Sequence, residues 1–374
     1  MRIAILTLPL NTNYGGILQA YALQTTLQQI GHRAVVLDTN RYPTISLYKA
    51  ILAYPLRIYK KYIKGDKRII IRREYQTKVR NLFFCHNTEI FIRHYIRRLE
   101  YSSLATLSFH NFDAIIVGSD QIWRPMYFKP IENAFLQFAQ NWDIKRIAYA
   151  ASFGTDNWEY STEQTKKCKA LVKKFDAISV REDSGVKLCK QYLNIQAKHV
   201  LDPTMLLTAQ DYIKLIPKDL LVTNKKRKLF IYILDKTTKK QQIIDYIANE
   251  KSLEKNNVGA PIYDESLPLT ERIQPPVEDW LEGFINADFV ITDSFHACVF
   301  SILLKRPFIA IGNQQRGMSR FKSLLTMFNL KDRLIYEEDA PTEILYKDID
   351  WNAIDCILAQ KRKYSLEFLN SILN

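Results

Sequence analysis

The chain has 374 residues, of which 47% are hydrophobic and 12% aromatic, so it has enough apolar surface to fold and is not globally disordered. Its 53 Lys and Arg residues exceed its 39 Asp and Glu residues, which gives a formal net charge of +14. The low content of Gly and Pro, 11 and 13 residues, excludes fibrous and low-complexity classes, and the length suits two domains.

The five cysteines are scattered and include no Cys-x-x-Cys pair, which argues against a disulfide framework and for a reducing compartment. The six histidines lack a ligand spacing such as His-Glu-x-x-His, so we expect no metal site. The apolar start of the chain lacks a signal-peptide cleavage site, and no apolar run reaches the roughly 18 residues of a membrane span. We therefore expect a cytoplasmic protein.

Short apolar runs alternate with longer amphipathic segments in the first half of the chain. Runs rich in Ile, Val and Ala are typical of buried parallel strands, and amphipathic segments of roughly ten residues or more are typical of helices. The expected strands are 3–8, 34–38, 113–118, 146–152, 177–181 and 199–202, and the expected helices include 17–30 and 163–174. This alternation predicts an α/β doubly wound domain.

A second series of the same kind begins after the basic turn at 224–228. Its expected strands are 229–234, 289–294 and 307–312, and its expected helices are 239–250, 277–286, 295–304 and 320–328. The pattern predicts two Rossmann-like domains, 1–205 and 206–350, facing a cleft where the carboxyl ends of strands present ligand groups. The last segment, 351–374, predicts a helix that packs back on the first domain.

One segment, at about 45–105, breaks this rhythm and predicts a basic helical insertion in the first domain. Between residues 45 and 98, 14 Lys and Arg residues face only three Asp and Glu residues and are interleaved with Ile, Leu and Tyr. Fourteen minus three is +11, so most of the net charge of +14 lies here. Either the insertion is a solvated surface, or it docks on an anionic membrane. No nucleic-acid motif accompanies the charge, so we expect no nucleic-acid partner.

The first strand-to-helix turn, residues 11–16, contains Asn13, Gly15 and Gly16. Two glycines let backbone N–H groups approach an anion or a sugar hydroxyl at the positive end of a helix. The turn does not match the Gly-x-Gly-x-x-Gly pattern of dinucleotide sites. It is therefore either a contact for an acceptor sugar or a purely structural turn.

The expected strand 113–118 is followed by Ser119, Asp120, Gln121 and Trp123, at the edge where an α/β sheet presents ligand groups. Asp120 either accepts a proton or hydrogen bond from a sugar hydroxyl or caps a following helix. We expect Trp123 to stack on a sugar ring, and Ser119 and Gln121 to contact the same acceptor.

Two later strands end in ionisable side chains that suit an anionic ligand. Arg181 closes the strand 177–181, and its planar guanidinium group either binds a phosphate or carboxylate or pairs with Glu182 or another acid. His296 lies in the first turn of the helix after strand 289–294, where an imidazole can exchange protons near neutral pH. A lone histidine can be purely structural, but its place at the edge between the domains favours catalysis.

Taken together, these segments resemble the polysaccharide pyruvyl transferase family. The matching stretches, in chain order, are NYGGILQAYALQ, DAIIVGSDQIWR, RIAYAASFG, AISVREDSG, VLDPTMLL, VEDWLEGFINADFVITDSFHACVFSILLKRPFIAIGN and RGMSRFKSLL. The resemblance implies a GT-B-like fold. It also implies transfer of a pyruvyl group from phosphoenolpyruvate onto two hydroxyls of a sugar, forming a cyclic ketal, with no cofactor besides this donor.

By the same resemblance, His296 matches the family's essential histidine, and Arg181 matches an arginine that binds the phosphate or carboxylate of the donor. Asp120 is then a candidate base or ligand of the acceptor sugar. The hypothesis needs both an acid and a base, because a proton is added to the donor and protons leave the sugar hydroxyls.

One departure concerns the donor site. Many members have Arg-Leu-His where this chain has Ser294 before Phe295 and His296, so a donor-binding arginine is absent from its usual place. We expect Arg316 or Arg320 to take over that contact, with Ser294 still lining the donor site.

The leading hypothesis is an enzyme, a pyruvyl transferase of capsular or exopolysaccharide biosynthesis. We expect it to act on a lipid-linked oligosaccharide at the inner face of the plasma membrane, with residues 45–98 as the membrane contact. Two alternatives stay open: a nucleotide-sugar glycosyltransferase of the same architecture, and a catalytically silent sugar-binding component of polysaccharide assembly.

Overall fold

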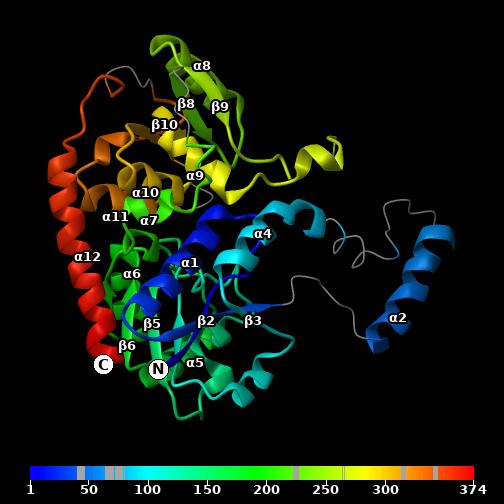
Figure 1. Cartoon of the computed structure of the whole chain (residues 1–374). Coiled ribbons are helices and arrows are strands. Elements are labelled where there is room, and N and C mark those ends of the chain that lie inside the picture. Colours follow the sequence, from blue (N-terminus) through cyan, green and yellow to red (C-terminus); the bar gives the residue numbers. More distant parts are fainter. Residues whose placement is uncertain are drawn as a thin grey trace.

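The computed structural model describes residues 1–39, 47–63, 71, 79, 81–221, 227–262, 264, 266–312, 317–339 and 344–374. These residues form two α/β units, each built on a parallel β-sheet and placed one above the other (Figure 1). The predicted class, two Rossmann-like doubly wound domains with a basic helical insertion in the first, is confirmed.

The first sheet has seven parallel strands in the order β3-β2-β1-β4-β5-β6-β7. The strands are β1 (Arg2–Leu6), β2 (Arg33–Thr39), β3 (Arg98–Tyr101), β4 (Ala114–Val117), β5 (Lys145–Ala151), β6 (Ala177–Val180) and β7 (Lys198–His199). The strand order reverses between β1 and β4, and open α/β sheets bind ligands at the carboxyl ends of strands beside such a reversal.

Helices and short turns connect these strands. They are α1 (Tyr14–Gln29), α4 (His86–Tyr95), η2 (Leu104–His110), η3 (Ile131–Phe135), η4 (Gln137–Ala139), α5 (Thr162–Leu171), η5 (Val172–Lys174), α6 (Asp183–Leu188) and η6 (Cys189–Leu193). The turn η7 (Pro203–Met205) and the helix α7 (Ala209–Ile213) then lead toward the second unit. Because α1 follows β1, its N-terminus lies at the carboxyl edge of the first sheet, which is the edge nearest the second unit (Figure 1).

The second sheet has five parallel strands in the order β12-β11-β10-β8-β9. Its strands are β8 (Lys228–Tyr232), β9 (Glu254–Asn257), β10 (Ala287–Thr292), β11 (Phe308–Ile311) and β12 (Leu334–Ile335). The helices and turns of this unit are α8 (Thr238–Glu250), η8 (Leu269–Arg272), α9 (Val277–Ile285), α10 (Phe295–Leu303), α11 (Ser319–Met327) and η10 (Lys331–Arg333).

Three strands are absent from the sequence prediction, and each lacks the apolar run on which that prediction depends. β9 reads Glu-Lys-Asn-Asn at an edge of the second sheet, and β12 at the other edge has only two residues. β3 reads Arg-Leu-Glu-Tyr at the edge of the first sheet. Edge strands form through backbone hydrogen bonds to one neighbour and need fewer apolar side chains than central strands.

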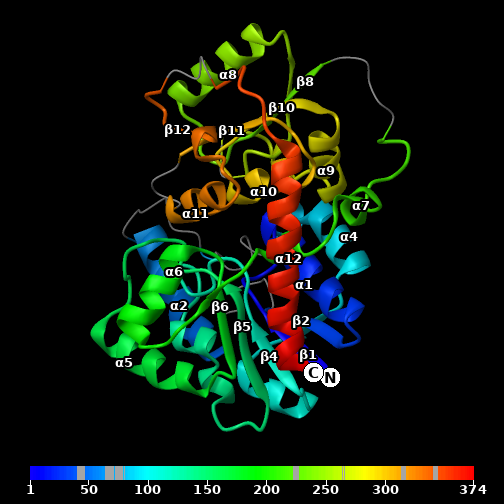
Figure 2. The ribbon, with the colours of Figure 1, turned by 90° about the vertical axis from the view of Figure 1, so that its left-hand side faces the viewer.

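The C-terminal helix α12 (Trp351–Leu373) runs along both units (Figure 2). In its middle, Arg362 donates to the backbone carbonyl of Met205, in the connection between the units. Farther along, Phe368 packs on Tyr149 of β5 with ring centroids 6.2 Å apart. The helix therefore returns from the second unit to the first sheet.

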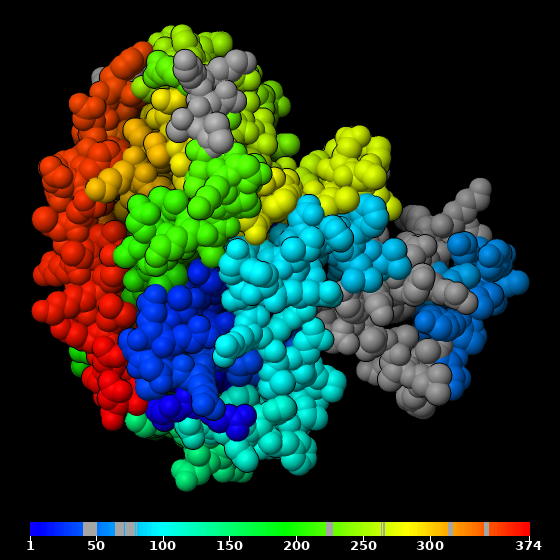
Figure 3. All heavy atoms as spheres, viewed as in Figure 1, coloured from blue at the N-terminus to red at the C-terminus, as the bar shows by residue number. Residues whose placement is uncertain are grey.

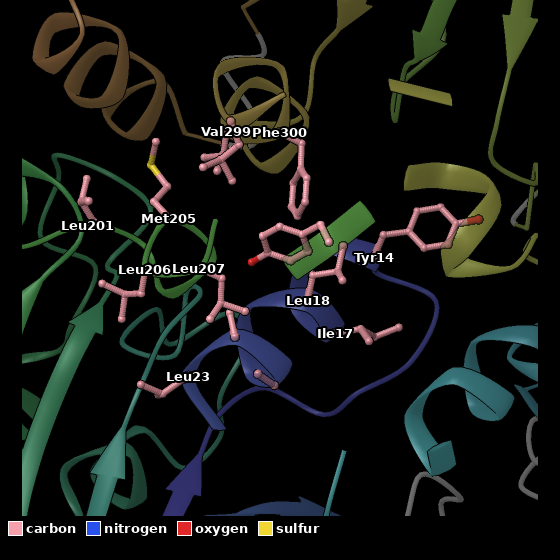
Figure 4. Close-up of a cluster of buried hydrophobic side chains, with 14 of the residues drawn as sticks. Tyr14, Ile17, Leu18, Leu23, Leu201, Met205, Leu206, Leu207, Val299 and Phe300 are labelled. Atoms are coloured by element: carbon pink, nitrogen blue, oxygen red, sulfur yellow. The ribbon is translucent and has the colours of Figure 1, made fainter. Parts of the chain in front are cut away.

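One hydrophobic cluster crosses from the first unit to the second (Figure 4). It joins side chains of α1, of residues 201–207 and of α10. The labelled members are Tyr14, Ile17, Leu18, Leu23, Leu201, Met205, Leu206, Leu207, Val299 and Phe300. Burying one large aliphatic or aromatic side chain contributes about 1.5–3 kcal/mol. This cluster therefore holds three segments, each bearing a residue of the site described below, against one another.

The basic insertion divides into two parts. Its last helix, α4, belongs to the body, since Phe91 and Ile92 are buried in the core. By contrast, α2 (Leu47–Ile58) and the π turn η1 (Tyr59–Ile63) stand away from both sheets (Figures 1 and 3). Residues 45–46, 64–70, 72–78 and 80 of the segment predicted as an insertion lie outside the described residues.

Candidate active site

Four ionisable side chains from separate elements meet between the two units. Arg181 follows β6, Asp202 follows β7 by three residues, and Asp120 follows β4 by three residues, all at the carboxyl edge of the first sheet. His296 is the second residue of α10, which starts at the carboxyl edge of the second sheet. All four are buried. Parallel strands deliver their following residues to one edge, so positions far apart in sequence come together.

Arg181 and Asp202 form the centre of this cluster. Nη1 of Arg181 donates to Oδ2 of Asp202 at 2.7 Å, and each side chain is only 1% exposed. Nε2 of His296 lies 3.6 Å from the same Oδ2 and 3.5 Å from Nη1 of Arg181. A neutral Nε2 can accept from the guanidinium group, whereas a protonated Nε2 is attracted to the carboxylate. Nε2 therefore lies between a hydrogen-bond donor, Arg181, and a carboxylate, Asp202.

Asp202 is held by more than its ionic partners. The hydroxyl and the backbone N–H of Thr204 donate to Oδ1 at 2.6 and 3.0 Å, and the hydroxyl of Ser119 donates to Oδ2 at 3.2 Å. Burial alone would raise the pKa of Asp202, but the hydrogen bond and charge of His296, the charge of Arg181 and the Thr204 hydroxyl hold it well below its usual range. Asp202 is therefore a fixed anion beneath Arg181 and His296.

Arg181 retains hydrogen-bonding capacity. Among the described residues, its Nε and Nη2 atoms are buried and have no hydrogen-bond partner, while Oδ1 of Asp120 lies 3.5 Å from Nη2 at ion-pair distance. Burial would lower the pKa of Arg181, but Asp202, Asp120 and Glu182 raise it above its ordinary value, so the group stays charged. Buried donors without partners are uncommon and cost about 1–3 kcal/mol each, so these two atoms can donate hydrogen bonds to an anionic ligand.

Arg181 and a second arginine, Arg320, both lie against the aromatic ring of Phe295. The guanidinium carbon of Arg181 lies 4.4 Å from the ring centroid of Phe295, and that of Arg320 lies 5.6 Å from it. Burial, and then the charge of Arg181, lower the pKa of Arg320 to about 10. Both groups are therefore cationic at neutral pH, and a ligand with two negative groups would relieve the repulsion between them.

The imidazole of His296 packs directly on the start of α1. A Cβ built on Gly15 would lie 2.1 Å from Nδ1 of His296, which is an overlap. Only glycine at position 15 leaves room for the ring in this orientation. We predicted Gly15 as a contact for the acceptor sugar, and the structure gives it a further role as the surface that positions His296.

Of two supporting carboxylates, Asp202 was not predicted as a site residue, and Glu182 was considered only as an ion-pair partner of Arg181. Asp202 follows a strand at the same sheet edge as Arg181, and this placement is the signal that could have found it. Glu182 is fully buried, and its Oε1 accepts from the backbone N–H groups of Phe153 and Gly154. A Cβ on Gly317 would lie 1.7 Å from the carbonyl oxygen of Gly154, so the loop that Glu182 holds touches the second unit.

The prediction that Trp123 stacks on a sugar ring is wrong. Trp123 is fully buried, its ring stacks on Phe135 with centroids 4.8 Å apart, and its Nε1 donates to the carbonyl of Ala134 at 3.1 Å. The prediction for Ser119 is also wrong, because it is fully buried and its hydroxyl supports Asp202. Both residues belong to the packing beneath the site.

The neighbours of Trp123 differ from expectation as well. Gln121 accepts from Nη1 of Arg124 at 3.3 Å, and a Cβ on Gly154 would lie 2.0 Å from its Oε1, so its side chain is packed internally. Asp120 does not cap a helix, because turns follow it and its φ is +58°. Its carboxylate instead faces Arg181. Tyr127, which we did not predict, is exposed at this rim with the guanidinium group of Arg124 5.5 Å from its ring centroid.

The remaining predicted residues lie at the borders of the cluster. Asn13 and Gly16 flank Gly15 at the start of α1, and a Cβ on Gly16 would lie 3.2 Å from Nδ2 of Asn13. Ser294 is the residue before α10, and its backbone N–H donates to the hydroxyl of Thr292 at 3.0 Å. Arg316 lies outside the described residues.

The two α/β units, each built on a sheet of parallel strands, have the GT-B architecture, and the buried polar cluster lies between them. Solved structures similar to this chain include a spinosyn rhamnosyltransferase complexed with thymidine diphosphate, at 10% identity and a TM-score of 0.51 over 100% of both chains. The UDP-GlcNAc 2-epimerase from Methanocaldococcus jannaschii is similar at 14% identity and a TM-score of 0.54 over 100% of this chain and 99% of that chain. At these identities the likeness concerns the fold alone. No curated protein sequence matches the chain.

The sequence of the chain also matches the model of a protein family. The model of the polysaccharide pyruvyl transferase family matches residues 13–315. The chain therefore belongs to the polysaccharide pyruvyl transferase family, as its motifs predicted. The matched region contains Arg181, Asp202 and His296, and it ends shortly before Arg320.

Proposed function

We propose that this protein transfers the pyruvyl group of phosphoenolpyruvate to two hydroxyls of one sugar, forming a cyclic ketal in capsular or exopolysaccharide biosynthesis. Family membership supports an enzyme of the pyruvyl transferase class. The observation that carries the proposal is the pair of buried donors on Arg181, Nε and Nη2, which lack hydrogen-bond partners among the described residues, in a guanidinium group whose Nη1 lies 3.5 Å from Nε2 of His296.

Phosphoenolpyruvate carries a phosphate and a carboxylate. The guanidinium groups of Arg181 and Arg320, both against the ring of Phe295, can bind these two negative groups. The planar fork of Arg181 can bind either group through Nε and Nη2, while Asp202 occupies Nη1. Arg320, the second cation on Phe295, takes the role of the arginine missing at Ser294. Asp202 occupies Nη1, so the atoms left for a negative group of the donor are Nε and Nη2, the second of which lies 3.5 Å from Oδ1 of Asp120.

The first chemical step is transfer of a proton from Nε2 of His296 to the methylene carbon of phosphoenolpyruvate. Asp202 stabilises the charged imidazole before transfer, because its carboxylate lies 3.6 Å from Nε2. The neighbouring carbon becomes electrophilic, and one sugar hydroxyl adds to it and releases its proton. Asp120, beside Arg181, is the candidate acceptor of that proton.

The second step closes the ring. The bond between the electrophilic carbon and the phosphate oxygen breaks, and the arginines stabilise the departing phosphate. The second sugar hydroxyl then attacks the same carbon and also releases its proton. His296 accepts the proton of the second hydroxyl, and Asp120 passes the proton of the first hydroxyl to the departing phosphate, so both side chains return to their starting states.

For the acceptor, we propose Tyr127 in place of Trp123 as the aromatic that stacks on the sugar. Tyr127 is 41% exposed, and it lies near enough to Arg320 to contribute to the pKa of that group. Beneath its ring, Arg124 is held by both carboxylate oxygens of Glu159 at 3.0 and 2.9 Å. A fixed cation under an exposed aromatic ring makes a rigid platform for a sugar.

We further propose that the acceptor is lipid-linked and that the insertion docks the enzyme on an anionic membrane. The apolar side chains of α2 and η1 with exposures of 53–72% are Ile51, Leu52, Leu56, Tyr62 and Ile63. Soluble surfaces rarely expose so many neighbouring apolar residues without a partner. Basic residues around them, including Lys60 and Lys61, suit anionic headgroups, each contributing about 1 kcal/mol near the surface. No described helix is long and apolar enough to span a bilayer.

Docking is tested with vesicles of phosphatidylglycerol and phosphatidylcholine. The variant Ile51→Ser/Leu52→Ser should lose binding to the anionic vesicles, whereas Ile90→Ser, an equally exposed control on α4, should keep it. Point variants are needed because deleting 45–98 would also remove Phe91 and Ile92 from the core. Unchanged binding by the double variant would refute the docking proposal.

The reaction is tested by incubation with phosphoenolpyruvate and lipid-linked oligosaccharides. We expect phosphate release coupled to an acceptor that gains a pyruvyl ketal. Consumption of a nucleotide sugar instead, with thermal stabilisation by a nucleoside diphosphate and none by phosphoenolpyruvate, would replace this function with glycosyl transfer.

A further inference from the structure

A hollow lined by arginines lies at the opposite end of the first sheet from the candidate active site. It has a volume of about 280 Å³, and its lining includes Arg2, Arg33, Arg97, His110 and Phe112. These residues lie where β1, β2 and β3 begin or just before a strand begins, whereas the candidate active site lies at the carboxyl ends of the strands. The N-terminus marks this end in Figure 1, on the side away from the second unit.

Strand register places the arginines on one face of the sheet. Arg2 of β1 is the direct partner of Arg33 of β2. Arg98 of β3 is the direct partner of Val36 of β2. Arg97, one residue before Arg98, therefore lies beside Val35. Since side chains alternate along a strand, Arg2, Arg33 and Arg97 face the same side, and Arg98 faces the other.

The backbone under these arginines is fixed by buried or paired groups. The side chain of Gln24, buried in α1, donates to the carbonyl of Arg97 at 2.7 Å and accepts from its N–H at 2.9 Å. Asp113 accepts from the N–H of Arg2 at 2.5 Å and donates its own N–H to the carbonyl of Arg2 at 2.9 Å. The backbone positions of the arginines are therefore fixed, although Arg2, Arg33 and Arg97 are exposed residues.

The charges in this hollow are not neutralised by the described residues. Arg98 also lines the hollow, but its guanidinium group is on the other face and pairs with Asp38 and Glu89. Across the described ranges, none of the side chains of Arg2, Arg33 and Arg97 forms an ion pair. Like charges held close together on neighbouring strands repel one another. An anion that bridges them would relieve this repulsion.

We propose that this hollow is a binding site for a phosphoryl group, separate from the candidate active site. Arginine binds phosphate through two parallel N–H donors, and three arginines around one hollow can hold a phosphate or diphosphate from several sides. The phosphoryl group comes either from a soluble phosphate compound or from a phospholipid headgroup. The inference does not depend on the proposed reaction.

The test uses inorganic pyrophosphate as the probe, with calorimetric titration of the full chain at about 0.15 M salt. The variant Arg33→Gln/Arg97→Gln should bind pyrophosphate at least about tenfold more weakly, since each charge-assisted contact is worth a factor of this order. The control Lys187→Gln/Lys363→Gln removes the same charge from side chains that are each 79% exposed and should bind like wild type. Turnover should not change, because the hollow lies at the other end of the sheet.

Vesicles distinguish the two sources of the phosphoryl group. If the site takes a headgroup, the Arg33→Gln/Arg97→Gln variant binds phosphatidylglycerol vesicles more weakly than the lysine control; if it takes a soluble ligand, only pyrophosphate binding falls. The proposal is overturned if wild type binds neither probe, or if the arginine variant and the lysine control weaken binding equally. Each result stands whether or not the protein turns over phosphoenolpyruvate.

Discussion

Replacing Asp202 with asparagine removes the anion on which Arg181 and His296 both depend. The Arg181–Asp202 pair is nearly inaccessible to water, so the variant leaves a buried guanidinium charge without its partner at 2.7 Å. Breaking a buried ion pair from one side costs about 3–5 kcal/mol. Asparagine keeps an oxygen that can accept from Thr204, so we expect the low end, about 3 kcal/mol of the free energy of unfolding.

The dependence on pH identifies the charge as the cause. The folded-state pKa of Asp202 is well below the unfolded value of about 3.9, so its contribution to stability is fully present above that value. The contribution is lost as pH falls toward the folded pKa. The stability difference between wild type and Asp202→Asn should therefore be constant near neutral pH and should narrow below about pH 4.

Denaturant unfolding at several pH values measures both effects. The matched control is Asp355→Asn, which breaks an exposed pair with Lys305 and should cost about 0.5 kcal/mol. If Asp202→Asn is no less stable than this control at neutral pH, or if the difference does not change in acid, the account of Asp202 as a fixed buried anion is refuted.

Three further predictions concern the site. Arg181→Lys should keep the charge but lose the planar fork, so kcat/KM for phosphoenolpyruvate should fall roughly a hundredfold or more; wild-type kinetics would contradict the anion role. Gly15→Ala should displace the ring of His296 and lower kcat by about a hundredfold, with an unchanged kcat counting against the observed contact. Trp123→Ala should lower the free energy of unfolding by about 3–5 kcal/mol, whereas Tyr127→Ala should raise KM for the acceptor with little effect on stability. The opposite pattern would restore Trp123 as the sugar platform.

The sequence was sufficient to predict those features of the fold that depend on the local pattern of apolar residues. Apolar runs located the central strands, and the helix predicted after residue 350 matches α12, whose apolar positions recur with a helical period. Arg181 and Asp120 could be predicted at one edge because each follows a parallel strand of the first sheet, and His296 could be placed at the corresponding edge of the second sheet because it follows a strand there.

Features that depend on how loops turn and how the two units meet could not be predicted. The segment after β4 continues without a regular helix and carries Asp120 at a positive φ, and Trp123 is buried in the core three residues later. The contact between Gly15 and His296 arises only when α1 and α10 pack together, and neither segment signals it alone. The polar edge strand β9 lacks the apolar pattern that identifies a strand.

The most direct test of the central claim is mass spectrometry of the sugar product formed in deuterated water by wild type and His296→Gln. The His296→Gln variant should fold normally. Because glutamine cannot exchange a proton, its turnover should fall by at least about a hundredfold. With wild type, we expect one equivalent of phosphate and a pyruvyl ketal whose methyl group carries one solvent deuterium. A His296→Gln variant that forms the labelled ketal at the wild-type rate, or a wild-type protein that forms no ketal from phosphoenolpyruvate with any lipid-linked acceptor, would contradict the account.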